Sequence, residues 1–327
     1  MIAAMRAMIS ALVILVMPFA AAYAQPATLP HVAVVMATSP PASSARIVAF
    51  QQGLGELGYT EGRNVVLDLH SWSSANRPLA DLARELVQGN PTVIVAESNQ
   101  AILALKGATL TVPIVMAVAG DPVGSGFVTS LARPGANITG LSNTAEQLSG
   151  KRLELLKEIV PKLTRVAVLR NPKNQTHILL LRETELAAQT LGLTLLVVDF
   201  RGEEDLAGAF GAMVRDHAQA VIVLPQPAGI ILRRPLAELA ARHRLPAIFP
   251  SPEPVEVGGL MAYGPSHTAL WRQAASYVDR ILKGARPADL PIEQPTRFEL
   301  VLNLKAARAL GLSIPQSMLL RADQVID

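Results

Sequence analysis

From His31 onward, short β-branched runs alternate with amphipathic segments, and this alternation restricts the possible folds more than any other feature. The run at 32–36 (VAVVM) predicts a buried strand. Ile47, Phe50 and Leu54 then lie on one face of a helix predicted at 45–57. Strands that alternate with helices predict parallel sheets covered on both faces. The sequence therefore predicts an α/β fold.

The alternation runs through the chain twice. The first round has strands at 32–36, 65–69, 93–96, 113–118 and 138–141, and one of its helices is predicted at 123–132. The second has strands at 165–169, 193–199, 220–224, 247–249 and 260–263. The length of 327 residues also suggests two domains. We expect two doubly wound parallel-sheet lobes joined by a hinge. The N-terminal lobe covers 25–142 and the C-terminal lobe 143–265, and residues from about 266 to 327 return in part to the first lobe.

The N-terminus has the pattern of a secretory signal peptide. Arg6 precedes an apolar run at 8–19, and Ala22-Tyr23-Ala24 places small residues before Gln25. The run is shorter than the roughly 20 residues that span a bilayer, although an uncleaved anchor remains the alternative. We expect a signal peptide at 1–24 and a mature protein in the periplasm. The absence of cysteine excludes disulfides, a thiol nucleophile and a lipid-modified cysteine.

Motifs for enzymatic chemistry are incomplete. The G-x-G-x-x-G string at 53–58 lies inside a predicted helix, whereas a dinucleotide site needs it directly after a strand. The stretch 140–144 resembles a nucleophile elbow, but Thr144 stands where the second glycine belongs. Gly150-Lys151-Arg152 lacks the upstream glycine of a P-loop, and we interpret it as a solvated helix start. We therefore expect a protein that is not an enzyme.

The ionisable residues point to neither a metal nor a nucleic acid. The six histidines form no H-x-x-x-H or H-E-x-x-H pair, so we expect no metal site and no cofactor. The formal net charge is only +3, and the basic residues are interleaved with acidic ones. A nucleic-acid partner requires a basic patch or stripe, and none is present in this pattern.

Polar residues follow the predicted strands in both halves. Open α/β sheets bind ligands outside the carboxyl ends of their strands. Taken singly, each such residue is more often a cap or an Asx turn than a ligand contact, and Asp121 suits the N-cap of the helix predicted at 123. Their recurrence in both halves is what a cleft between two lobes requires. The candidate ligand-binding residues are Ser98, Asn99, Asp121, Asn143, Asn171, Gln226 and Tyr263.

Tyr263 ends a predicted strand just before Gly264-Pro265, which gives the chain a sharp exit. We expect its ring and hydroxyl at the hinge-side floor of the cleft, because tyrosine has an apolar body and a polar tip. The alternative is a core tyrosine that supports the crossover between the lobes.

Six stretches along the mature chain resemble the TrpX/YtrX-type substrate-binding proteins of ABC importers. They are G-x-x-x-LGY-x-EG-x-NV at 53–65, GDPVGSG at 120–126, LARPG-x-N-x-TG at 131–140, KRLELLKE at 151–158, GGLM-x-YGP at 258–265 and DLPIEQP at 289–295. The resemblance implies a type I periplasmic-binding fold, with two lobes joined by three crossovers and a ligand bound between them. It also implies that the seven candidate residues lie on loops facing the cleft. Some members of this family are associated with aromatic amino acids.

The resemblance and the residues together suggest an exported solute-binding protein. We expect it to capture a small organic ligand, such as an amino acid or an aromatic compound, by hinge closure and to deliver it to an inner-membrane permease. We expect a monomer. A periplasmic sensing protein is the alternative that uses the same lobes, and an exported α/β hydrolase is a further one.

Overall fold

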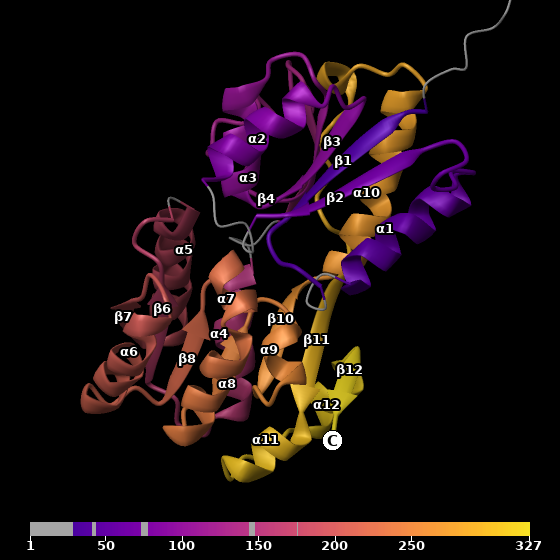
Figure 1. The fold of residues 1–327 in the computed structure, drawn as a ribbon. Helices are drawn as coiled ribbons and strands as arrows, with labels where there is room; N and C mark the ends of the chain where they lie inside the picture. Colours follow the sequence, from indigo (N-terminus) through magenta and orange to yellow (C-terminus); the bar gives the residue numbers. More distant parts are fainter. Residues whose placement is uncertain (1–28, 41–43, 73–77, 144–147, 175) are drawn as a thin grey trace, which may run out of the picture.

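The computed structural model describes residues 29–327 except 41–43, 73–77, 144–147 and 175, and it has two lobes (Figure 1). The signal peptide predicted at 1–24 lies outside the described residues. Each lobe consists of one sheet with helices on both faces, as the alternation in the sequence predicts. Within the described part of the chain, no helix combines the length and the apolar character needed to cross a membrane.

The first lobe contains a five-stranded parallel sheet. Its strand order is β2 (Val66–Ser71), β1 (His31–Met36), β3 (Val93–Glu97), β4 (Ile114–Gly120) and β5 (Ile138–Asn143). One face packs against α1 (Ser44–Glu56) and α10 (His267–Leu282), and the other against α2 (Leu79–Gln88) and α3 (Asn99–Ala108). All residues of β3 are buried because helices cover both of its faces, which is why the strand is almost entirely apolar.

The second lobe contains a seven-stranded sheet. Its order is β12 (Gln324–Ile326), β11 (Phe298–Asn303), β10 (Met261–Pro265), β9 (Ala247–Phe249), β8 (Ala220–Val223), β6 (Arg165–Arg170) and β7 (Thr194–Asp199). The pairing is parallel except between β10 and β11. One face packs against α4 (Ser149–Ile159), α5 (Thr176–Leu191), α11 (Leu304–Ala309) and α12 (Gln316–Arg321). The other packs against α6 (Glu203–Arg215), α8 (Arg233–Arg242) and α9 (Glu253–Glu256), and α7 (Pro227–Ile231) precedes α8.

The chain after β10 contributes elements to both lobes. Helix α10 returns to the first lobe, where Trp271 meets Phe50 of α1 edge-on with ring centroids 5.8 Å apart. After the short 3-10 helix η2 (Pro287–Asp289), the main chain of Glu293 pairs with β5. Of residues 266–327, the tail at 298–310 joins the second lobe and not the first. Strand β11 pairs antiparallel with β10, and α11 packs in the second lobe.

The helix predicted at 123–132 is absent. A single turn forms instead, in which the amide of Ser125 donates to the carbonyl of Asp121 at 2.9 Å. Gly126 then has a φ of +69°, a left-handed conformation that ends a helical turn. The apolar periodicity at 123–132 is real, but Gly124 and Gly126 disfavour a helix interior by about 1 kcal/mol each.

Candidate functional site

A cleft lies between the lobes at the carboxyl ends of their strands. The first lobe lines it with residues at or just after the carboxyl ends of β1, β3, β4 and β5, and the second with residues at or just after those of β8, β9 and β10. Its empty volume, which includes the solvent at its mouth, is about 930 Å3. Apolar wall is supplied by Val118, Leu180, Val223, Ile230 and Phe249.

Arg152 is a buried cation on the wall of this cleft. It lies in the first turn of α4, where Leu155, Leu156 and Ile159 follow it at the spacing that keeps side chains on one helix face. This face packs into the second lobe, and the Arg152 side chain is carried in with it to 0% exposure. An arginine is almost never fully buried unless it is paired. The position of Arg152 therefore indicates that its side chain contacts a bound solute and does not only support the fold.

Within the described part of the chain, one edge of the Arg152 guanidinium is bound and the other is not. Its Nε donates to the carbonyl oxygen of Tyr263 at 2.8 Å. Nη1 and Nη2 are buried and have no hydrogen-bond partner among the described residues. Burial lowers the pKa of Arg152 to about 10, so the side chain is still charged at neutral pH. Two adjacent donors on a planar cation are suited to the two oxygens of a carboxylate.

A second charged group lies across the lobes, between α1, β3 and α9. Nη1 of Arg46 lies 3.0 Å from Oε1 of Glu97 in the same lobe and 3.5 Å from Oε1 of Glu253 in the other lobe. Nη2 of Arg46 donates to the Thr38 hydroxyl at 2.8 Å, and Oε2 of Glu97 accepts the Ala37 amide at 3.1 Å. Two carboxylates therefore surround one guanidinium.

His267 completes this group at the N-terminus of α10. It lines the cleft, and its Nδ1 and the Oε2 of Glu253 are both buried without a hydrogen-bond partner among the described residues. Burial lowers the pKa of His267 more than the nearby Glu253 raises it, so the ring is neutral at pH 7. Burial acts to raise the pKa of Glu253, but the pKa is lowered overall, with the Arg46 charge and the Ser251 hydroxyl favouring the carboxylate. Across the described ranges, no three histidine, cysteine, aspartate or glutamate side chains are placed to hold a metal ion.

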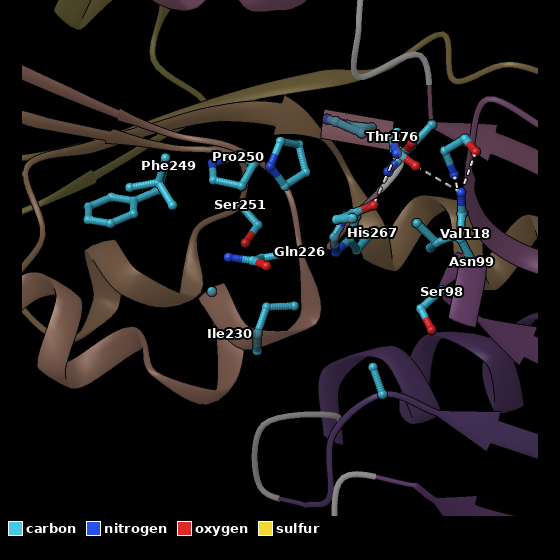
Figure 2. Close-up of a pocket in the computed structure, with 18 of the residues that line it drawn as sticks. Ser98, Asn99, Val118, Thr176, Gln226, Ile230, Phe249, Pro250, Ser251 and His267 are labelled. Atoms are coloured by element: carbon cyan, nitrogen blue, oxygen red, sulfur yellow. Dashed lines mark hydrogen bonds between the residues drawn. The ribbon is translucent and has the colours of Figure 1, made fainter. Parts of the chain in front are cut away.

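The two lobes also touch beside the cleft through Asn99 and Thr176 (Figure 2). Nδ2 of Asn99 lies 2.8 Å from the Gly120 carbonyl oxygen, 2.9 Å from the Ser125 hydroxyl and 3.1 Å from the Thr176 hydroxyl. Ser98 precedes this residue with a φ of +85°, a strained value for a residue other than glycine. Strain of this kind concentrates at ligand sites, which agrees with the position of Ser98 on the cleft wall.

Four of the seven predicted site residues line the cleft, namely Ser98, Asn99, Asn143 and Gln226. Oδ1 of Asn143 and Nε2 of Gln226 are buried without a partner among the described residues, so each offers a ligand one hydrogen bond. Figure 2 shows Gln226 near Ser251, on the side of the second lobe.

The other three lie outside the lining. Asp121 accepts the Gly124 amide at 2.9 Å, which caps a turn and not the predicted helix. Asn171 forms an Asx turn by accepting the Lys173 amide at 2.9 Å. The ring of Tyr263 stacks on Phe298 at 6.3 Å, and it is the carbonyl of Tyr263 that reaches the site, through Arg152.

Sequence reasoning missed several residues of the cleft. The prediction that Arg152 belongs to a solvated helix start is wrong, and its place on the stripe with Leu155 and Ile159 was a usable signal. Glu97 directly precedes the predicted Ser98, at the end of a buried strand. Four further polar lining residues carry no distinguishing pattern in the sequence: Asn174, Thr176, Ser251 and His267.

Comparison with known proteins gives a consistent family. The model of the ABC transporter substrate binding protein family matches residues 31–326. A tyrosine-binding protein of Clostridioides difficile (strain R20291) is 24% identical over 265 residues, which are 80% of this chain and 75% of that protein.

Two solved structures extend the comparison. A conserved domain protein of Vibrio cholerae O1 biovar El Tor has a TM-score of 0.83 and 30% identity, covering 90% of this chain and 99% of its own. An ABC domain of Streptococcus pneumoniae in complex with L-Trp has a TM-score of 0.84 and 26% identity, covering 91% and 100%. These similarities confirm the two-lobed α/β class.

Proposed function

This chain belongs to the ABC transporter substrate-binding protein family, and from that premise we propose that its solute is a small organic carboxylate held by Arg152. The family consists of substrate-binding proteins and not of enzymes. The protein therefore needs only to bind, enclose and release its solute. The expected capture of a solute by the protein follows from the family, and the chemical class of the solute is inferred from the cleft.

The observation that carries this proposal is the state of the Arg152 guanidinium. A buried ion without a counter-ion loses its hydration and gains little in return. Nη1 and Nη2 are buried and unpartnered among the described residues, and Arg152 is one of the residues that line the cleft. A carboxylate there would supply both a negative charge and two acceptor oxygens, and charge-assisted pairs of this geometry are among the strongest hydrogen bonds.

The rest of the cleft fits a solute with an apolar body. The wall of valine, leucine, isoleucine and Phe249 offers contact area, while Asn143 and Gln226 offer single polar contacts that fix orientation. One relative is named for tyrosine and another was solved with L-Trp, so amino acids of this size are the first candidates for this chain.

Binding would draw the lobes together, because Arg152 belongs to the second lobe and Ser98 and Asn99 to the first. Closure around a ligand by hinge motion is an established behaviour of such two-lobed receptors. The closed form would then dock on a membrane permease. The pattern of Arg6, the apolar run at 8–19 and Ala22-Tyr23-Ala24 supports export to the periplasm, where such a receptor meets its solute.

A requirement for the carboxylate can be measured with matched compounds. We expect L-tyrosine, L-tryptophan or L-leucine to bind in calorimetry, and the amide of each binder to bind at least about 30-fold more weakly. The amide keeps the side chain and the ammonium but removes the negative charge. A hydrogen bond to a charged group is worth about 1.5–3 kcal/mol. Equal affinity for an amino acid and its amide, or no binding by any of the three amino acids at 1 mM, would contradict the proposal.

A further inference from the structure

Two contacts join the lobes through protein groups alone. The first is the ion pair between α1 and α9, in which Nη1 of Arg46 lies 3.5 Å from Oε1 of Glu253. The second is the hydrogen bond at 3.1 Å from Nδ2 of Asn99, at the start of α3, to the hydroxyl of Thr176, at the start of α5 (Figure 2). Because neither contact needs a solute atom, both can form whether or not a solute is bound.

The first lobe holds Arg46 in place for its contact with the second lobe. The Arg46 side chain is only 3% exposed. Its Nη1 donates to Oε1 of Glu97 at 3.0 Å, and its Nη2 donates to the Thr38 hydroxyl at 2.8 Å. Both acceptors belong to the first lobe, so the guanidinium can keep its position when the lobes separate. A guanidinium that is already oriented loses little further side-chain freedom when a second carboxylate approaches it.

Glu253 is held by the second lobe in the same way. It is the first residue of α9, and the next two residues, Pro254 and Val255, are buried, with Val255 in the core of that lobe. Neither Glu253 nor Arg46 is among the residues that line the cleft. The ion pair between them is therefore separate from the place that a solute occupies.

The charge on Glu253 favours contact between the lobes. Arg46 attracts it, whereas Glu97, on the same guanidinium, repels it. Burial acts to raise the pKa of Glu253, yet the pKa is lowered overall, so the attraction outweighs the repulsion and the loss of hydration. The Glu253 side chain is 16% exposed, and a pair this far from solvent is screened by salt much less than a surface pair.

The contact between Asn99 and Thr176 is built on the same plan. Asn99 is fixed within the first lobe, where its Oδ1 accepts the Gly120 amide at 2.9 Å and its Nδ2 donates to the Gly120 carbonyl at 2.8 Å. Thr176 comes from the second lobe, and its Cγ2 would lie 3.3 Å from a Cβ at Gly120. The two lobes therefore approach closely at this point, with a hydrogen bond oriented in advance by one of them.

We propose that these two contacts form a latch that populates the closed form of the protein without a solute. The latch consists of the Arg46–Glu253 ion pair and the Asn99–Thr176 hydrogen bond. The apparent affinity of a ligand rises with the fraction of protein that is already in the binding-competent form. The ion pair should therefore raise the affinity for every solute of the cleft by the same factor, without selecting among them. This inference goes beyond the proposed function, because it does not depend on which solute binds.

A distance measurement between the lobes tests the latch without any solute. The chain contains no cysteine, so Gln88→Cys in α2 and Glu183→Cys in α5, both at exposed positions, place one spin label on each lobe. The mature protein is unfolded, dialysed and refolded to remove any solute that was purified with it. Pulsed electron spin resonance should then give two distances, the shorter of which matches the present structure. Glu253→Gln keeps the shape of the side chain but removes its charge, and should lower the ratio of the short to the long population at least about fivefold.

Each variant has a matched control on the same helix. Glu256 is an exposed residue of α9, and Glu256→Gln should leave both populations unchanged. Thr176→Val removes the hydroxyl of the second contact and should also shift the populations toward the longer distance, so the test does not depend on the folding of one variant. Thr190→Val changes an exposed threonine at the other end of α5 and should have no effect.

A solute-free protein that shows only the longer distance would overturn the latch, and so would a Glu253→Gln variant whose short population is unchanged or larger. Calorimetry adds a second criterion. Glu253→Gln should weaken the binding of the tightest-binding amino acid and of its amide by the same factor, and unequal factors would show that Glu253 contacts the solute instead. Loss of the amide discrimination in the original protein would overturn the proposed function and leave the latch intact, because the distance measurement uses no solute.

Discussion

Arg152→Met should abolish solute binding and at the same time raise the melting temperature of the ligand-free protein. Methionine fills a similar volume on the buried stripe with Leu155 and Leu156 but supplies no charge or donor. Loss of a bidentate, charge-assisted contact should lower the affinity for the tightest-binding amino acid by at least about 100-fold, or about 2.7 kcal/mol.

The gain in stability follows from the electrostatics of the free protein. Burial disfavours the charged form of Arg152 and lowers its pKa to about 10, well below the usual range of an arginine, which corresponds to a penalty of about 3 kcal/mol. A cation whose pKa is lowered by folding carries this full penalty below about pH 10, and the penalty is lost as the pH rises from there toward the pKa of the unfolded chain's arginine. Removing the Nε donor leaves the carbonyl of Tyr263 unsatisfied, which costs about 1–2 kcal/mol. The net effect is a stabilisation of about 1–2 kcal/mol at neutral pH.

Calorimetry and thermal unfolding test the two halves together. Arg182→Met removes an exposed arginine of α5 and should change neither affinity nor melting temperature by a measurable amount. If Arg152→Met binds within threefold of the original protein, Arg152 does not hold the solute. If it binds weakly and also melts earlier, the residue stabilises the scaffold, and the argument from its buried charge is wrong.

Gly264→Ala should destabilise the protein by about 3 kcal/mol or more and lower the melting temperature by roughly 6–12 °C. Gly264 lies in β10 beside the site, and a Cβ there would stand 1.9 Å from the carbonyl oxygen of Pro250. The obstacle is backbone and cannot rotate away. The same Cβ would also lie 3.6 Å from Nη2 of Arg152, so the displaced strand should disturb the guanidinium as well.

Gly208→Ala is the matched control for this substitution. Gly208 lies in α6, and a Cβ there meets nothing within 4 Å, so alanine should stabilise the helix by up to about 1 kcal/mol. Thermal unfolding of the two purified variants gives the comparison. A melting temperature for Gly264→Ala within 2 °C of the original protein would show that β9 and β10 can separate without cost.

The architecture could be predicted because burial on both faces of a parallel sheet leaves a periodic record in the sequence. Strands such as β3 are apolar throughout, and helices such as α4 repeat leucine at helical spacing. The prediction of a helix at 123–132 was wrong because the apolar pattern carries no information on how much Gly124 and Gly126 destabilise a helix. The pairing of β11 with β10 was not predicted, because two strands separated by more than thirty residues leave no local signal of their contact in the sequence.

The sequence could predict where the site lies but not most of the side chains that form it. Strand ends gave Ser98, Asn99, Asn143 and Gln226, because topology alone brings such residues to the cleft. The same rule wrongly favoured residues whose side chains are used by local turns, as in Asp121 and Asn171. Arg152 lies in the first turn of a helix and not at a strand end, so a search of strand ends could not find it. Arg152 is distinctive because Nη1 and Nη2 lack hydrogen-bond partners among the described residues, and that depends on the tertiary structure.

The most direct test of the account is a crystal structure of the mature protein with the tightest-binding amino acid of the panel. We expect both carboxylate oxygens within hydrogen-bonding distance of Nη1 and Nη2 of Arg152, with Nε still bound to the Tyr263 carbonyl. A solute whose carboxylate binds elsewhere in the cleft, with Nη1 and Nη2 left to water or to a neutral group, would contradict the central claim.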